Sequence, residues 1–172
     1  MKRGKKAQET FGLSFSMIFA IFLIAASAFV AFYVINHFLN LNKCTQVGFF
    51  YTDLGDRVND LWLSDKGEFT FTGEIPSAGI FRTKITYACL GNLTQQYLRN
   101  NDRIKQEELM RKGLPLRHNA FLYPSSAACD DLASNVIPHL TIDKFFCTNV
   151  TNGKVYIKLF KLSPGSPVMA SP

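Results

Sequence analysis

The stretch FGLSFSMIFAIFLIAASAFVAFYVINHFL, residues 11–39, decides how the rest of the chain is read. It contains no Asp, Glu, Lys or Arg. As an α-helix rising about 1.5 Å per residue it would be roughly 40 Å long, more than the hydrocarbon core of a bilayer at about 30 Å. A helix that is apolar on every face needs protein layers around it that a chain of 172 residues does not supply. The stretch therefore predicts a membrane-spanning helix.

Charged residues on either side of this stretch predict its orientation. The cations before it are Lys2, Arg3, Lys5 and Lys6, and its far end is flanked only by His37 and Lys43. Because Lys and Arg accumulate on the cytoplasmic side of a membrane helix, we expect a cytoplasmic N-terminus and an extracytoplasmic C-terminal part. The expected single-pass organisation, in contact with membrane lipid, is a basic cytoplasmic leader at 1–7, a transmembrane helix at 8–40 and an extracytoplasmic head at 41–162.

The net charge of +6 is concentrated before the head. Residues 1–43 hold five Lys or Arg and one Glu, whereas residues 44–172 hold 14 cations and 12 acids. In the second part cations alternate with acids and do not gather with aromatic residues, as they do where proteins bind single-stranded nucleic acid. We expect no nucleic-acid partner.

Helical periodicity continues over residues 43–62, called the stem below. Apolar residues recur there at alternating steps of four and three: Val47, Tyr51, Leu54, Val58 and Leu61. Charged residues fall between them, at Asp53, Asp56, Arg57 and Asp60. This pattern predicts an amphipathic helix whose apolar side packs on the core of its own domain. Asn36, Asn40, Asn42 and Gly48 lower the helix propensity at the junction, so the helix is either continuous or broken there.

The chain beyond the stem predicts an antiparallel sheet. GEFTFTGEI (67–75) and RTKITYACLG (82–91) alternate apolar and polar residues, as strands do. FFCTNVT (145–151) and KVYIKLF (154–160) flank Asn152-Gly153, a dipeptide typical of a type I′ hairpin turn. We therefore expect the last two strands to pair with each other, with Val155, Ile157 and Leu159 facing the core.

Two short helices and a tail complete the expected fold. Residues 95–112 are rich in polar helix formers and end before Gly113, which predicts a solvated surface helix. Asp130 and Asp131 predict the capped start of a helix over Leu132–Ile137. The tail at 163–172 is rich in Pro, Gly and Ser, and we expect it to be disordered. The fold class is α+β: a long N-terminal transmembrane and amphipathic helix, followed by a small antiparallel β-rich head with one or two short helices.

All four cysteines follow the predicted transmembrane helix, at Cys44, Cys89, Cys129 and Cys147. An oxidising compartment outside the membrane would allow two disulfides. Three connectivities exist. We favour Cys44 with Cys89, which would join the stem to the sheet, and Cys129 with Cys147, which would close a short loop. No pair has the spacing of a zinc or redox motif, and His37, His118 and His139 are scattered, so no metal site is expected.

No catalytic or cofactor-binding pattern occurs in the chain. It lacks a glycine-rich phosphate loop and a nucleophile elbow, and no histidine has a catalytic partner nearby in sequence. We expect a non-enzymatic protein without a cofactor. Two triplets, Asn92-Leu93-Thr94 and Asn149-Val150-Thr151, are candidate N-glycosylation sites on an extracytoplasmic head. We expect Asn149 to be the less readily used of the two, since it falls in a predicted strand.

Small residues recur along one side of the predicted transmembrane helix, at Gly12, Ser16, Ala20, Ser27 and Ala31. Small residues let membrane helices approach closely, which makes this line a candidate for helix association. They are also common in membrane helices generally, so contact with lipid is the alternative.

The stretch KKAQETFGLSF, residues 5–15, places a small residue between a lysine pair and the apolar helix. It resembles the class III signal of type IV pilins, especially archaeal pilin-like proteins, in which a prepilin peptidase cuts between a basic leader and an intact hydrophobic helix. The resemblance implies that Lys5, Lys6 and Ala7 end the leader and that Gln8 begins the processed chain. It further implies a cell-surface subunit that assembles with itself or with other pilin-like subunits into a filament through its N-terminal helix.

Two alternatives remain open. An ordinary secretory signal would be cut after Ala26-Ser27-Ala28, but the chain would then begin at Phe29 with an uncharged apolar stretch. A signal anchor that keeps residues 1–7 would tether an extracytoplasmic binding or accessory module that does not polymerise.

Overall fold

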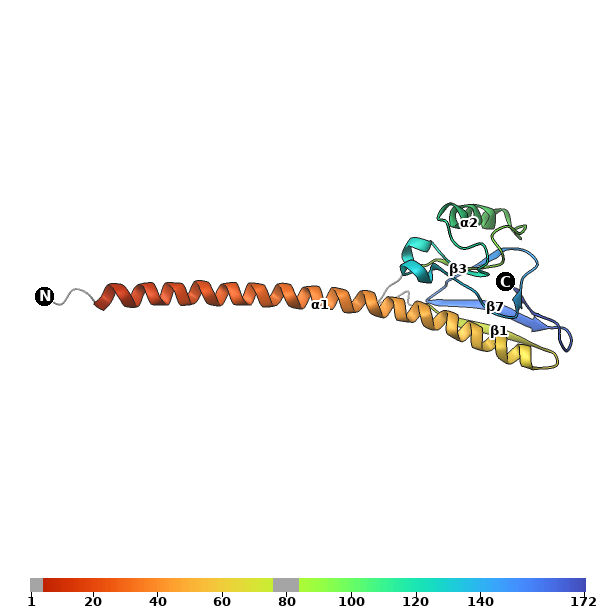
Figure 1. The fold of residues 1–172 in the computed structure, drawn as a ribbon, viewed down its shortest axis with the longest axis horizontal. Helices are drawn as coiled ribbons and strands as arrows, with labels where there is room; N and C mark the ends of the chain where they lie inside the picture. Colours follow the sequence, from red (N-terminus) through yellow and green to blue (C-terminus); the bar gives the residue numbers. More distant parts are fainter. Residues whose placement is uncertain (1–4, 76–83) are drawn as a thin grey trace. The chain divides into compact units, whose positions relative to one another are not determined.

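The structure, a computed structural model, describes residues 5–75 and 84–172, with side chains described from Phe15 onward except at 40–43 and 130. A long helix is followed by two small sheets and short helices (Figure 1), so the α+β fold class is confirmed. The chain divides into two compact units, Met1–Asn40 and Leu41–Pro172. The name head refers below to this second unit, which extends to Pro172.

Helix α1, Lys5–Leu63, is continuous for 59 residues. It passes without a break through Asn36, Asn40, Asn42 and Gly48, so the continuous alternative is the one observed. Within the head, tertiary packing outweighs the weak propensity of single residues, because the apolar side of the stem is buried. Val47, Tyr51, Leu54 and Val58 are each at most 3% exposed, which confirms that the stem packs on the core of its own domain.

Sheet A has the strand order β1-β7-β8-β5. Its strands are β1 (Gly67–Glu74), β7 (Lys154–Lys161), β8 (Val168–Ser171) and β5 (Leu140–Thr141). β1 and β7 are antiparallel over their whole length, from Gly67 opposite Lys161 to Glu74 opposite Lys154. β8 is antiparallel to β7 and parallel to β5.

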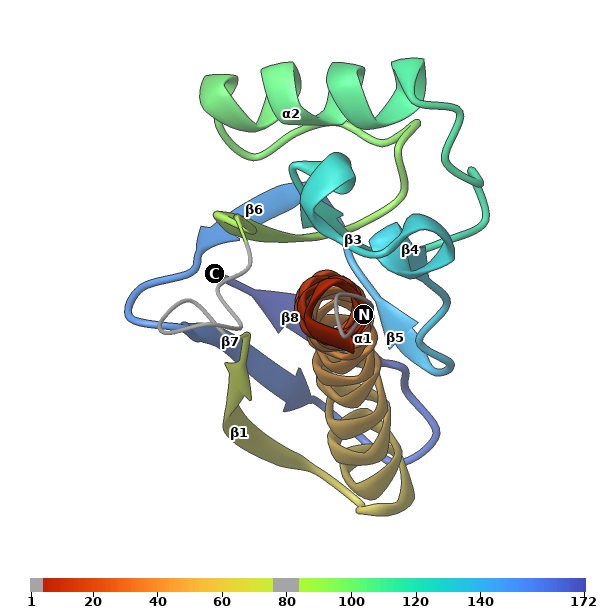
Figure 2. The ribbon, with the colours of Figure 1, turned by 90° about the vertical axis from the view of Figure 1, so that its left-hand side faces the viewer.

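Sheet B has the strand order β4-β3-β2-β6, and its neighbouring strands are all antiparallel. Its strands are β4 (Ser134–Asn135), β3 (Ala120–Tyr123), β2 (Tyr87–Leu90) and β6 (Phe146–Asn149). Helix α2, Asn100–Arg111, lies on the side of sheet B that faces away from the stem (Figures 1 and 2).

The core of the head has two parts. In the larger part, the stem packs against the inward residues of sheet A, which include Phe71, Val155, Ile157 and Leu159. The smaller part lies under α2 and consists of Cys89, Leu93, Leu109, Phe121, Phe145 and Cys147. Sheet B is therefore covered on both faces, which explains why Ala88, Cys89 and Leu90 are all buried although they alternate in direction.

The predicted hairpin is half right. Asn152 and Gly153 both have positive φ, 52° and 75°, as a type I′ turn requires. The strands on either side nevertheless belong to different sheets: β6 pairs with β2, and β7 pairs with β1 and β8, so they meet only at a bridge from Thr151 to Lys154 beside the turn. The prediction failed because β1 offers β7 a full-length partner, whereas a disulfide ties β6 to β2.

The predicted disordered tail is also wrong. Residues 168–171 form β8, Val168 is fully buried, and its backbone nitrogen donates a hydrogen bond of 3.0 Å to the His139 carbonyl oxygen. The Pro-, Gly- and Ser-rich composition suggested disorder. A four-residue strand nevertheless needs few core formers when β7 and β5 supply hydrogen-bonding partners on both sides.

Both predicted helices of the head need correction. The first is shorter than residues 95–112, because the Gln95 side chain instead bonds the Ile142 carbonyl at 2.8 Å and α2 begins only at Asn100. The second, over Leu132–Ile137, does not form: a 3₁₀ turn, η3 (Asp130–Ala133), leads into β4. The Asn119 side chain holds the Ile137 backbone in place of a helical bond, accepting from its nitrogen at 2.7 Å and donating to its oxygen at 2.9 Å.

Candidate functional site

The surface of α1 between Phe15 and Phe38 is apolar and uncovered. Every residue in this range is exposed, with Phe15 at 72% and Phe29 at 73%. Among the described residues, α1 is the one helix long and apolar enough to cross a membrane, and none of its most apolar stretch is buried. Because water would solvate such a surface poorly, it needs lipid or other protein around it.

The predicted line of small residues lies on this surface. By helical geometry Ser16, Ala20, Ser27 and Ala31 share one side, and all four are exposed. Ser27 and Ala31 lie in a shallow groove whose other lining residues are Leu23, Ala26, Val30, Val34 and Ile35. The Ser27 hydroxyl donates to the Ile24 carbonyl at 2.9 Å, which satisfies its donor within the helix. Gly12 lies among residues whose side-chain surroundings are outside the described part.

The predicted leader junction falls at the start of α1. Lys5, Lys6, Ala7 and Gln8 are helical, and their side chains lie outside the described residues, as do residues 1–4 entirely. The leader proposal therefore depends on the sequence.

The predicted disulfide pairing is wrong. The bonds are Cys44–Cys129 and Cys89–Cys147. Cys89 and Cys147 lie directly opposite each other on β2 and β6, with Cα atoms 4.0 Å apart, so neither is available to a more distant partner. Cys44 on the stem instead reaches Cys129, immediately before η3. This bond ties the stem to the rest of the head close to where the head begins, at Leu41.

The opposite end of the stem is held by a buried lysine that the sequence analysis missed. Lys161, at the end of β7 and 5% exposed, donates hydrogen bonds to the carbonyl oxygens of Trp62 at 2.5 Å and Ser64 at 2.6 Å. Its Nζ also lies 5.0 Å from the centre of the Trp62 ring, on which His139 stacks at 4.4 Å. A cation here satisfies carbonyls that have no partner within the helix and complements the negative end of the helix dipole.

A signal for Lys161 was present in the strand pattern. Val155, Ile157 and Leu159 face inward at alternate positions, and the next inward position is occupied by Lys161. A lysine at an inward position of a buried strand must find acceptors, and the end of a neighbouring helix is one place that offers them.

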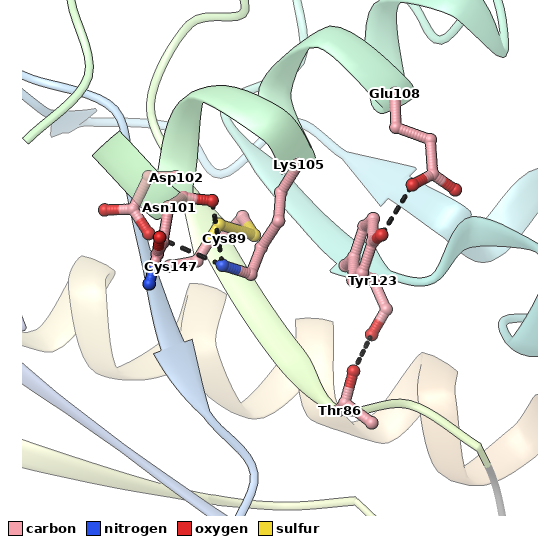
Figure 3. Close-up of a disulfide and its surroundings, with 8 residues drawn as sticks. All are labelled: Thr86, Cys89, Asn101, Asp102, Lys105, Glu108, Tyr123 and Cys147. Carbon is pink, nitrogen blue, oxygen red and sulfur yellow. Dashed lines mark hydrogen bonds and ion pairs between the residues drawn. A yellow bond between two sulfur atoms is a disulfide. The ribbon is translucent and has the colours of Figure 1, made fainter. Parts of the chain in front are cut away.

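Helix α2 carries a buried charge cluster above the Cys89–Cys147 disulfide (Figure 3). Lys105 lies with its Nζ 3.8 Å from an Asp102 carboxylate oxygen, 3.0 Å from the Asn101 carbonyl oxygen and 4.1 Å from the centre of the Tyr87 ring. Asp102 is 3% exposed, and its other oxygen, Oδ2, has no hydrogen-bond partner in the described part of the chain.

Two further polar contacts attach α2 to the head. The Gln106 amide donates to the Leu93 and Gln95 carbonyls, both at 2.8 Å. Tyr123 donates to Glu108 at 2.5 Å, and this hydrogen bond, with partial burial, raises the pKa of the Tyr123 phenol. The expectation that α2 is merely a solvated helix is therefore wrong, because its polar residues at 102, 105 and 106 are buried contacts.

The two candidate glycosylation triplets differ in accessibility. Asn92 is half-buried, and its Oδ1 accepts hydrogen bonds from the Thr94 backbone nitrogen at 3.0 Å and hydroxyl at 2.9 Å. Asn149 is exposed as the last residue of β6, and Thr151 is exposed beyond it. The structure thus leaves Asn149, which we expected to be the less favourable site, the more accessible of the two.

No group of three or more His, Cys, Asp or Glu residues is arranged to hold a metal ion within residues 5–75 and 84–172 as far as they are described. The scattered histidines stay apart: His37 stacks on Tyr33, His139 on Trp62, and His118 Nδ1 lies 2.8 Å from the Ser134 hydroxyl. Ser134 is 5% exposed, so this Ser–His contact is not open to a substrate.

Comparisons of the chain with protein families, with curated proteins and with solved structures found no match.

Proposed function

We propose that this protein is a non-enzymatic cell-surface subunit, similar to type IV pilin-like proteins, that assembles through its N-terminal apolar helix. One contrast within α1 carries the proposal. The apolar row of the stem is buried in the head, with Leu54 and Val58 fully covered, whereas residues 15–38 are exposed on every side. The apolar surface left for lipid or for a partner is therefore concentrated in the N-terminal part of α1.

In this proposal the segment from Gln8 to Leu39 is first held in the membrane, with the N-terminus in the cytoplasm and the head outside. Assembly then exchanges lipid contacts for contacts with helices of other copies or of other pilin-like subunits. Because lipid tails are as apolar as Leu, the exchange is driven by close packing, and the groove at Ser27 and Ala31 offers a surface for it.

The head supports an extracytoplasmic location. All four cysteines are paired in disulfides, which persist in oxidising compartments. The resemblance of residues 5–15 to a class III signal supports processing by a prepilin-type peptidase between Ala7 and Gln8.

Intact mass and N-terminal sequencing test the proposal, on unreduced protein from membranes and from a sheared surface fraction. We expect a chain that begins at Gln8, is lighter by four hydrogens than its reduced form, and is recovered in the sheared fraction. Retention of residues 1–7 in a chain confined to membranes would contradict the proposal and support a tethered module that does not polymerise. A chain beginning at Phe29 would contradict it in favour of an ordinary secretory signal.

A further inference from the structure

Charge is separated between two sides of the head. Residues 53–74, which span the charged part of the stem and β1, hold six acids and two cations, whereas residues 99–117, which span α2, hold six cations and three acids. Figures 1 and 2 show α2 on the side of the head away from the stem and β1. The head therefore has an acidic side and a basic side that face in different directions.

The acidic side is hollowed between the stem and β1. A groove of about 620 Å³ is lined by Asp53, Asp56, Arg57, Asn59, Asp60 and residues 69–72. Within it Arg57 pairs with Asp60 at 3.7 Å and lies over the ring of Phe69, which is 43% exposed. Asp53 and Asp56 form no ion pair with any described residue, so they carry the uncompensated charge of the groove.

Two other acids of this side are paired with lysines. Glu68 pairs with Lys158 at 2.8 Å and Glu74 with Lys154 at 3.8 Å, both across the β1–β7 ladder. These pairs lie on the outward face of sheet A, opposite the face that packs against the stem. Apart from Asp65, which follows the stem, the unpaired acids of this side thus lie in the groove.

The basic side carries its free cations at the end of α2 and in the segment after it. Arg111, Lys112 and Arg117 are exposed and form no ion pair within the described part of the chain. The acids closest in sequence are occupied, Glu107 by Arg103 at 2.9 Å and Glu108 by Tyr123. Leu116, 53% exposed, stands next to Arg117.

We propose that the groove between the stem and β1 binds the segment Arg111–Arg117 of a second copy of this chain. The free cations of one head would meet Asp53 and Asp56 of the next, and Leu116 would supply apolar contact to Phe69, so that a small apolar centre is rimmed by charge. The two surfaces are different and lie on different sides of the head, so the contact is heterologous and repeats from copy to copy. This inference rests on the proposed function, since it names the contact between heads in the assembly.

A pair of charge-reversed, full-length variants in lipid vesicles tests the contact. The first carries Asp53→Lys and Asp56→Lys, and the second carries Arg111→Glu, Lys112→Glu and Arg117→Glu. A zero-length carbodiimide reagent joins amines to carboxylates in direct contact, and mass spectrometry maps the joined positions. In the unaltered chain we expect links between Lys112 and Asp53 or Asp56, which must be intermolecular because these residues lie on different sides of one head.

Neither variant alone can form these links, because positions 53, 56 and 112 then all carry amines in the first variant and all carry carboxylates in the second, so each variant alone serves as the blank. A mixture of the two should restore links between positions 53 or 56 of the first variant and position 112 of the second, because each reversed surface now fits the other. A matched control, Lys84→Glu with Lys144→Glu, reverses two exposed cations elsewhere on the head and should link like the unaltered chain. Unreduced mass with both disulfides present confirms that each variant is folded.

Absence of these links from the unaltered chain, or their failure to form on mixing, would overturn the head contact. Failure of the head contact can be distinguished from failure of the proposed function. If the unaltered chain associates in the membrane but these links are missing from it or do not form on mixing, only the head contact is wrong. If the unaltered chain stays monomeric in vesicles, both the contact and assembly through the helix are contradicted.

Discussion

Lys161 holds Trp62 at the end of α1: its ammonium group donates a 2.5 Å hydrogen bond to the Trp62 carbonyl oxygen and lies 5.0 Å from the centre of the indole ring. At the other end of the stem, Cys44 is bonded covalently to Cys129. The stem is thus attached to the head at both ends, by a buried cation and by a disulfide, with its apolar side packed between them.

The first prediction concerns the buried cation. Lys161→Met should lower the free energy of unfolding of the head by about 2–3 kcal/mol, because the carbonyls of Trp62 and Ser64 stay buried without their charged donor. This change in the free energy of unfolding is measured by denaturant unfolding of the full chain in detergent. Lys158→Met, on the same strand but exposed, should change stability by less than about 0.5 kcal/mol. Equal effects of the two changes would contradict the assigned role.

The second prediction concerns the covalent attachment of the stem. Peptide mapping without reduction should recover Cys44 joined to Cys129, and Cys89 joined to Cys147. Replacing Cys44 and Cys129 together by Ser should cost about 2–5 kcal/mol, since the bond closes a long loop, with 85 residues of sequence separation. A recovered Cys44–Cys89 peptide would show that the cysteines pair differently.

The third prediction concerns the charge cluster on α2. Lys105→Met should destabilise the head by about 3 kcal/mol or more, because Asp102 is then buried without a countercharge. Adding Asp102→Leu to Lys105→Met should recover most of that loss, because the pair is replaced by apolar residues of similar size. The free energies of unfolding of the single and double variants are measured by denaturant unfolding. If the double variant is as unstable as the single one, the loss of stability comes from lost packing and not from the unpaired charge of Asp102.

The fourth prediction concerns pH. The hydrogen bond to Glu108 raises the pKa of Tyr123 in the folded head, so the neutral phenol is favoured by folding. Its contribution is complete below the unfolded pKa of about 10 and is lost as the pH rises through the folded pKa. Stability should therefore fall as the pH rises above about 10, and less steeply in Tyr123→Phe. If stability falls equally steeply with pH in both proteins, the hydrogen bond from Tyr123 to Glu108 does not contribute as stated.

The fifth prediction concerns the groove lined by residues between Leu23 and Ile35 of α1. Ala31→Leu should fill the groove beside Ser27 and weaken self-association in lipid vesicles by about 3- to 10-fold, since close approach of helices depends on small side chains. Energy transfer between labelled copies measures it. Ala25→Leu, on the opposite side of the helix, adds the same bulk outside the groove and should leave association unchanged. If Ala31→Leu and Ala25→Leu weaken association equally, the helices do not associate through the side that carries the groove.

Some features could be predicted because they depend on residues close together in sequence. Steps of four and three over Val47–Leu61 predicted the buried side of the stem, and alternation predicted the inward row of β7. Asn152-Gly153 predicted a turn with positive φ at both residues. The candidate assembly surface, residues 15–38, was visible for the same reason, because an uncharged run of this length needs no partner to be recognised.

By itself the sequence determined the elements that have a strong local pattern and which side of each is apolar: a helix of membrane length, an amphipathic stem, alternating strands and one tight turn. Only the tertiary structure decided which elements meet: Cys44 with Cys129, β6 with β2 rather than β7, β8 between β7 and β5, and Lys161 with the end of α1. The reason is physical. Local periodicity reports that a surface is buried, but the partner that covers it is selected by packing between distant segments, and the entropy of closing the loop between them depends only weakly on its length.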